Sequence, residues 1–107
     1  MIRMAQFDVY PNPSSSARQG IPYVVVIQSD LLDALATRLT IPLATSEWAG
    51  KSPDKLSPAV TVNGQRLRAL AHYAAPLPVR ALRQAVDNIS AQSGALVTAM
   101  DVVLSGV

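Results

Sequence analysis

The sequence predicts a mainly β domain of the α+β class, in which an antiparallel sheet is followed by one C-terminal α-helix. Three observations lead to this prediction: a β-branched stretch at 23–27, an Asn63-Gly64 pair between two alternating segments, and a helical apolar period near the C-terminus. A chain of 107 residues has the length of one domain, and we assign residues 1–107 to it.

The first elements are two strands separated by a long loop. Gln6–Tyr10 alternates polar and apolar side chains, which is typical of a half-buried strand. Residues 11–20 form a loop, because two prolines remove backbone donors and serines favour local hydrogen bonds. Tyr23–Ile27 is β-branched and aromatic and predicts a strand with both faces covered. Leu31–Ala36 has a helix-compatible composition but is too short to be assigned.

The middle of the chain predicts a third strand and a β-hairpin. Arg38–Ile41 is a strand that we expect to stop or bend at Pro42, because proline cannot donate to a central ladder. Residues 45–57 suggest a loop with one helical turn around Glu47 and Trp48. Asn63-Gly64 then joins two strands, and the pair suits a type I′ turn. After it, residues 76–78 are extended by their two prolines.

The C-terminal segment changes to a helical period. Four apolar residues recur at a spacing that places them on one helical stripe: Leu96, Ala99, Met100 and Val103. Ser90 or Asn88 can cap the start of this helix by accepting from a free backbone N–H. Gly106 is expected to end it in left-handed backbone.

Composition favours an interface-forming protein. Half of the residues are hydrophobic and only 15% are charged, and a surface poor in charge favours a homodimer. The net charge of +2 is weak and the basic residues do not form a block, so unaided binding to nucleic acid is not implied. The chain lacks cysteine, a bilayer-length apolar run and a signal-peptide segment, so we expect a soluble, cytoplasmic protein without membrane contact. Met4 is an alternative start.

No catalytic constellation stands out. His72 is the only histidine, and one ligand does not make a metal site, so we expect neither a metal nor another cofactor. The acidic residues are scattered, and Asp30 and Asp33 are interpreted as caps. Four arginines read either as a solvated basic face or as a contact for phosphate or carboxylate: Arg66, Arg68, Arg80 and Arg83. Trp48 is either a cover for the core edge or an interface anchor.

Several segments together resemble the CcdB toxin family of bacterial toxin–antitoxin modules. Gln6-Phe7-x-Val9-Tyr10 is similar to the family's start, and Gln28–Asp33 resembles its Gln-Ser-Asp segment. Arg38–Leu43 is similar to its Arg-x-x-Ile-Pro-Leu strand, and Pro58-x-Val60-x-Val62 to a later strand. The order and spacing hold from Gln6 to the C-terminus, apart from extra residues around the serine-rich loop.

The resemblance implies an SH3-like barrel that forms a homodimer and acts by binding, not by catalysis. It further implies a toxin that binds the GyrA subunit of DNA gyrase and traps the enzyme on cleaved DNA. A CcdA-type antitoxin would neutralise it, and only the toxin–antitoxin complex would bind operator DNA and repress the operon. The implied gyrase contacts lie in the Gln-Ser-Asp segment and at the C-terminal tip: Leu31, Leu32, Asp101, Leu104, Ser105, Gly106 and Val107.

The tip departs from the best-known family member, whose ending is Trp-Gly-Ile. Here Ser105-Gly106-Val107 places a hydroxyl where that member has an indole, which is a common interface anchor. Two alternatives therefore stay open. One is a ribonuclease toxin of the MazF/Kid type, which shares the barrel, and the other is a non-toxic chromosomal relative that acts mainly through antitoxin binding.

Overall fold

A computed structural model describes residues 4–106, so residues 1–3 and the predicted contact Val107 lie outside the described residues. Within 4–106, seven strands form one antiparallel sheet in the order β4-β5-β3-β2-β1-β7, with β6 paired to β3. The strands are β1 (Asp8–Pro11), β2 (Tyr23–Val26), β3 (Thr37–Ala44), β4 (Ala59–Val62), β5 (Gln65–Ala69), β6 (Ala75–Pro78) and β7 (Asp87–Asn88). The α-helices are α1 (Ser46–Ala49) and α2 (Ser93–Ser105). The 3-10 turns are η1 (Ser15–Ala17), η2 (Asp30–Leu32), η3 (Ala71–Tyr73), η4 (Val79–Ala81) and η5 (Ser90–Gln92).

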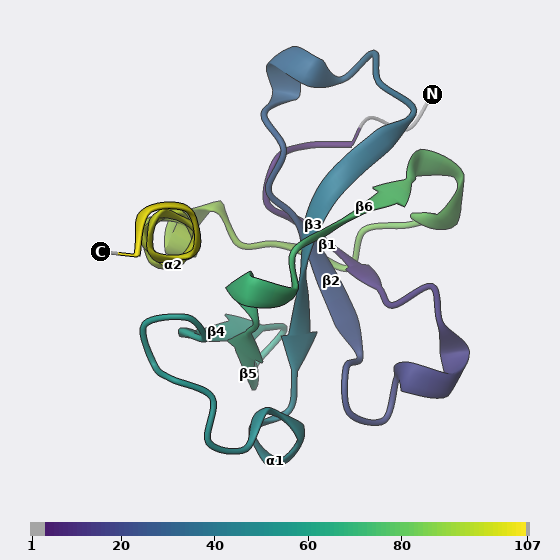
Figure 1. The fold of residues 1–107 in the computed structure, drawn as a ribbon. Coiled ribbons are helices and arrows are strands. Elements are labelled where there is room, and N and C mark those ends of the chain that lie inside the picture. Colours follow the sequence, from purple (N-terminus) through teal and green to yellow (C-terminus); the bar gives the residue numbers. More distant parts are fainter. Residues whose placement is uncertain (1–3, 107) are drawn as a thin grey trace.

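The long strand β3 shapes the sheet. One edge of β3 pairs with β2, while the other edge pairs first with β6 and then, at Leu43 and Ala44, with β5. This exchange of partners curves the sheet into a nearly closed SH3-like barrel, and α2 lies beside it (Figure 1). The predicted fold class is confirmed. No helix in residues 4–106 has the length and apolar character needed to cross a membrane.

The central strands bury side chains on both faces, as the apolar stretch at 23–27 predicts. Val9 and Val25 lie opposite each other in the ladder and belong to the main core, which also includes Leu96 and Ala99 from α2. Tyr10 and Val24, one residue away on each strand, point into a second cluster that Leu82 covers. The two-residue period of the strands therefore divides the core into two packed layers.

Tyr10 is the buried aromatic residue of the second cluster. Its hydroxyl lies 3.4 Å from Asp8 Oδ2, to which it donates, and its side chain is 1% exposed. Burial and the neighbouring Asp8 carboxylate raise the pKa of Tyr10 to about 12, while Arg38 acts in the opposite direction. The phenol is therefore held in its neutral form well above neutral pH.

The predicted stop at Pro42 is wrong, because β3 continues to Ala44, whereas the predicted alternative of a bend coincides with the change of partner from β6 to β5. Pro42 lies opposite Val24 in the ladder with β2, and its carbonyl accepts from the backbone N–H of Leu70. The backbone polar groups of Pro42 thus face the other edge of β3, at the point where β6 gives way to β5. No ladder donor is required from residue 42 there, so proline is tolerated.

The hairpin is confirmed in detail. Asn63 and Gly64 have φ angles of 46° and 83°, as a type I′ turn requires of both central residues. The predicted helical turn around Glu47 and Trp48 is also present as α1. Thr45, not a residue of the turn itself, caps it by accepting from the N–H of Trp48 at 3.2 Å.

The C-terminal helix follows the predicted stripe with two differences. Leu96 and Ala99 are buried and Met100 packs against them, but Val103 is 40% exposed because it lies beyond the core. The predicted cap is wrong: neither Ser90 nor Asn88 caps α2, since η5 intervenes and the cap position belongs to Gln92. Asn88 instead accepts from the N–H of Ser90 before η5. Gly106 ends α2 in left-handed backbone as predicted, with φ 71°.

Candidate partner-binding site

The segment after β2 presents apolar side chains to solvent. Leu31–Ala36 is not an α-helix; the structure has the turn η2 over Asp30–Leu32. Leu31 is 92% exposed, Leu32 48% and Leu35 52%. Exposing three leucines in one short loop is unfavourable in water, so this loop is a strong candidate for a contact surface.

Two polar side chains bind the backbone of this loop and fix its shape. Arg38 is 7% exposed, and its guanidinium donates to the carbonyls of Asp33 at 2.7 Å and Leu35 at 2.6 Å. The Gln28 amide donates to the carbonyls of Leu32 and Thr37 and accepts from the N–H of Leu39. Both ends of the loop are therefore attached to β3 by hydrogen bonds.

The Gln-Ser-Asp segment anchors the start of the loop. Ser29 caps η2 by accepting from the N–H of Leu31 at 3.2 Å. The interpretation of Asp30 as a cap is wrong, because its Oδ1 accepts from the N–H of Gln6 at 2.7 Å and so ties the loop to the chain before β1. Asp33 occupies the C-cap position of η2. The polar residues of the segment thus hold the exposed leucines in place.

The second predicted contact region is the end of α2. Leu104 is 79% exposed, and Asp101 one turn before it is also exposed. The Ser105 hydroxyl donates to the Asp101 carbonyl at 2.6 Å, and the Gly106 N–H donates to the Val102 carbonyl at 2.8 Å. These two bonds close the last turn of α2 and fix the position of Ser105 and Gly106.

An apolar groove lies between α2 and the barrel. Its volume is about 220 Å³, and Asp101 supplies its only charged side chain. The lining comes from the residue before β1, the residue after β2, β3 and α2: Phe7, Ile27, Leu39, Leu96, Val97, Met100 and Asp101. The groove therefore begins next to the η2 loop and runs along the helix that carries Leu104.

The structure does not place the two predicted contact regions in direct contact. The η2 loop projects beyond the start of β3, whereas α2 lies beside the barrel (Figure 1). The groove shares Asp101 with the second region. Sequence reasoning missed the 52% exposed Val97, which lines the groove, and the 52% exposed Leu35 of the η2 loop. Leu35 could have been found because it continues the apolar spacing that begins at Leu31.

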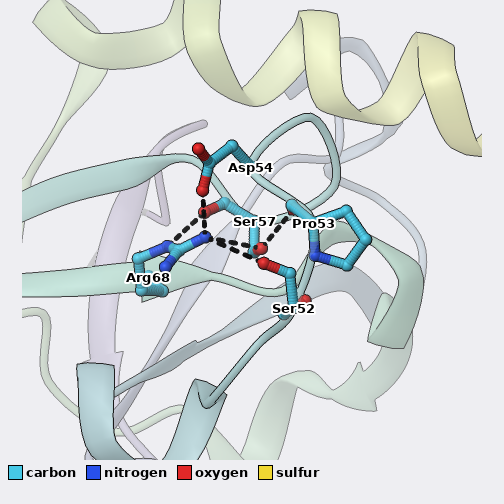
Figure 2. Close-up of polar contacts among 5 residues, drawn as sticks. All are labelled: Ser52, Pro53, Asp54, Ser57 and Arg68. Carbon is cyan, nitrogen blue, oxygen red and sulfur yellow. Dashed lines mark hydrogen bonds and ion pairs between the residues drawn. The ribbon is translucent and has the colours of Figure 1, made fainter.

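The arginines predicted as one basic face occupy two separate places. Arg68 lines a depression beside α1 with the exposed Arg66, while Arg80 and Arg83 line a different one. Figure 2 shows the Arg68 guanidinium directed into the 52–57 loop, where it donates to the Ser57 carbonyl and hydroxyl and pairs with Asp54 at 3.0 Å. Arg68 is thus engaged in holding this loop, which leaves Arg66 as the solvated member of the pair.

His72 and Trp48 belong to a small aromatic cluster on the surface. Trp48 meets Tyr73 edge to face with ring centroids 6.2 Å apart, and the His72 ring lies 4.5 Å from the Tyr73 ring. The Trp48 indole covers Gly20, where an added Cβ would approach within 2.1 Å, yet 49% of the side chain is exposed. Among residues 4–106, no group of three or more histidine or acidic side chains could hold a metal ion.

The amino-acid sequence that forms this barrel and helix can be compared with models of known protein families. A family model described as CcdB protein matches residues 6–106. The chain belongs to the CcdB family. This CcdB-family protein is accordingly the toxin of a toxin–antitoxin system. A search of curated protein sequences found no match to this chain.

Proposed function

We propose that this CcdB-family toxin binds the GyrA subunit of DNA gyrase through the η2 loop and the tip of α2, and poisons the enzyme without catalysis of its own. One observation carries the proposal: Leu31 and Leu104, at the two implied contact positions, are 92% and 79% exposed. Burying one exposed leucine side chain contributes about 1.5–3 kcal/mol of free energy. A partner that covers Leu31 and Leu104 would therefore gain binding free energy from both.

The proposed contact set keeps the residues that the family resemblance implies. It comprises Leu31, Leu32, Asp101, Leu104, Ser105, Gly106 and Val107, and the apolar groove between α2 and the barrel adjoins it at Asp101. Ser105 contributes a hydroxyl, and not an aromatic ring, to the tip. We therefore expect the leucines to supply the larger part of the affinity, because buried apolar area dominates where an aromatic anchor is missing.

A titration against the GyrA dimerisation fragment tests the contact set. Leu31→Asp and Leu104→Asp should each weaken binding at least about a hundredfold, because a carboxylate would be buried in an apolar contact. Val86→Asp is the matched control, since Val86 is 38% exposed and lies outside the set. Equal binding by wild type and both leucine variants would refute the site.

Removal of residues 105–107 is the second variant. These residues follow the last buried residues of α2, so the barrel should remain folded while GyrA binding is lost. In a supercoiling reaction with purified gyrase, the intact protein should cause cleaved DNA to accumulate. Specific cleavage of RNA by the protein alone would instead support a ribonuclease toxin and overturn the proposal.

The proposal includes the partners expected of the family. We propose a homodimer, supported by the low charge content and the exposed apolar residues of α2, and sedimentation of the purified protein checks it. A CcdA-type antitoxin would neutralise the toxin, and the complex would repress its own operon in the cytoplasm. The expected gel-shift result is retardation of operator DNA by the complex but not by the toxin alone.

A further inference from the structure

A second depression with a very different lining lies on the side of the barrel away from α2. Its volume is about 310 Å³, and it is lined by Pro11, Pro13, Arg18, Arg80, Ala81 and Arg83. The arginines come from the loop after β1 and from the turn after β6, which lie together across the sheet from α2 (Figure 1). We call this depression the arginine cleft.

The backbone on both sides of the arginine cleft is held in place. Arg18 Nε donates to the Asn12 carbonyl at 2.7 Å, and the buried Asn12 side chain donates to the Ile21 carbonyl and accepts from the Ser14 N–H. On the other side, Leu82 is 5% exposed and lies in the core between Arg80 and Arg83. The fold therefore fixes the two segments that carry the three guanidinium groups.

The charge of the cleft is not compensated within residues 4–106. No carboxylate lines the cleft, and the described structure contains no ion pair for Arg18, Arg80 or Arg83. Three like charges that converge on one depression repel one another, and the surrounding field favours an anion. Arg68 differs from these three arginines, because its guanidinium donates to backbone carbonyls and pairs with the Asp54 carboxylate.

We propose that the arginine cleft binds a phosphoryl group. A planar guanidinium donates two parallel hydrogen bonds to phosphate oxygens, and the three arginines carry more charge than a single carboxylate would neutralise. The volume suits a small group with its immediate substituents, since ligand pockets of about 300 Å³ are at the lower end of the usual range. The phosphoryl group belongs either to a free phosphate compound or to a DNA backbone, which the toxin alone would contact too weakly to retard DNA in a gel. The site lies apart from the proposed GyrA contact.

The test uses the intact protein with inorganic pyrophosphate as probe. Pyrophosphate should shift the Nε–Hε NMR signals of the cleft arginines in a saturable way. Arg80→Gln with Arg83→Gln should weaken that binding by at least about tenfold, because each removes a charge-assisted contact. Arg66→Gln is the matched control, since Arg66 is an exposed arginine outside the cleft. Arg18 is left intact because its Nε bond holds the loop.

A second arm identifies the source of the phosphoryl group. If a short DNA duplex competes with pyrophosphate, the ligand is backbone phosphate, and the double variant should flatten the slope of log K against log salt by about 2. If the duplex does not compete, the ligand is a free phosphate compound. The proposal is overturned by absence of saturable shifts, by equal weakening in the Arg66→Gln control, or by citrate binding as tightly as pyrophosphate. GyrA binding should be unchanged in the double variant, so failure here is separable from failure of the proposed function.

Discussion

Arg68 offers a quantitative test of how the 52–57 loop is held to the barrel. The change to consider is Arg68→Met, which keeps an apolar stem but removes the guanidinium. Ser57 is completely buried, and its carbonyl and hydroxyl both accept from Arg68. Each hydrogen bond to a charged group contributes about 1.5–3 kcal/mol, and an unsatisfied buried carbonyl costs about 1–3 kcal/mol.

The ion pair with Asp54 adds little to this sum. The Asp54 side chain is 98% exposed, and an exposed pair contributes about 1 kcal/mol or less. We therefore expect Arg68→Met to lower the free energy of unfolding by about 3 kcal/mol, which corresponds to a fall in Tm of roughly 15 °C for a domain of this size. Urea denaturation and thermal melting, both followed by circular dichroism, measure the two quantities.

Two matched variants separate the possible causes. Arg66→Met alters an exposed arginine on the same strand and should change stability by no more than about 0.5 kcal/mol. Asp54→Asn removes the ion pair but not the contacts with Ser57, so it should cost less than about 1 kcal/mol. The reasoning is refuted if Arg68→Met is as stable as Arg66→Met. It is also refuted if Asp54→Asn is as costly as Arg68→Met.

Three further predictions concern other parts of the fold. Gly64→Ala, at φ 83°, should cost about 1–2 kcal/mol of unfolding free energy in urea titration, because a Cβ is disfavoured in left-handed backbone. Gly20→Ala should displace the Trp48 indole, which a Cβ would approach within 2.1 Å, and its fluorescence maximum should shift relative to wild type. The raised pKa of Tyr10 means that the unfolded chain loses the phenolic proton first as pH rises, so the free energy of unfolding should fall by about 2 kcal/mol between pH 10 and about 12. Tyr10→Phe should lack this fall, and the same pH profile in wild type and variant would contradict the prediction.

Elements whose determinants are local could be predicted from the sequence. The strand at 23–27 follows from its β-branched side chains, and the hairpin follows from the tolerance of Asn63 and Gly64 for positive φ. Pro42 could not be assigned in this way. Its place within β3 depends on where the partner of one strand edge changes from β6 to β5, and that is decided by distant segments.

The exposure of the candidate contact residues could not be predicted from the sequence, and their role stays a prediction. A short apolar segment such as Leu31-Leu32 has the same composition in a core and in a contact loop, so exposure cannot be read from it. The roles of Gln28 and Arg38 depend on carbonyls that the fold brings to them. The division of the arginines into a loop-holding residue and a cleft is likewise a consequence of tertiary structure.

The attachment of the η2 loop to β3 has a consequence for how fast and how tightly a partner is recognised. Ordering a loop on association costs conformational entropy, about 0.5–1.5 kcal/mol for each immobilised side chain with many rotamers. Gln28 and Arg38 restrict the backbone of this loop before any encounter takes place. Association can then proceed without a slow rearrangement of the loop, and differences in affinity among tip variants should arise mainly in the dissociation rate.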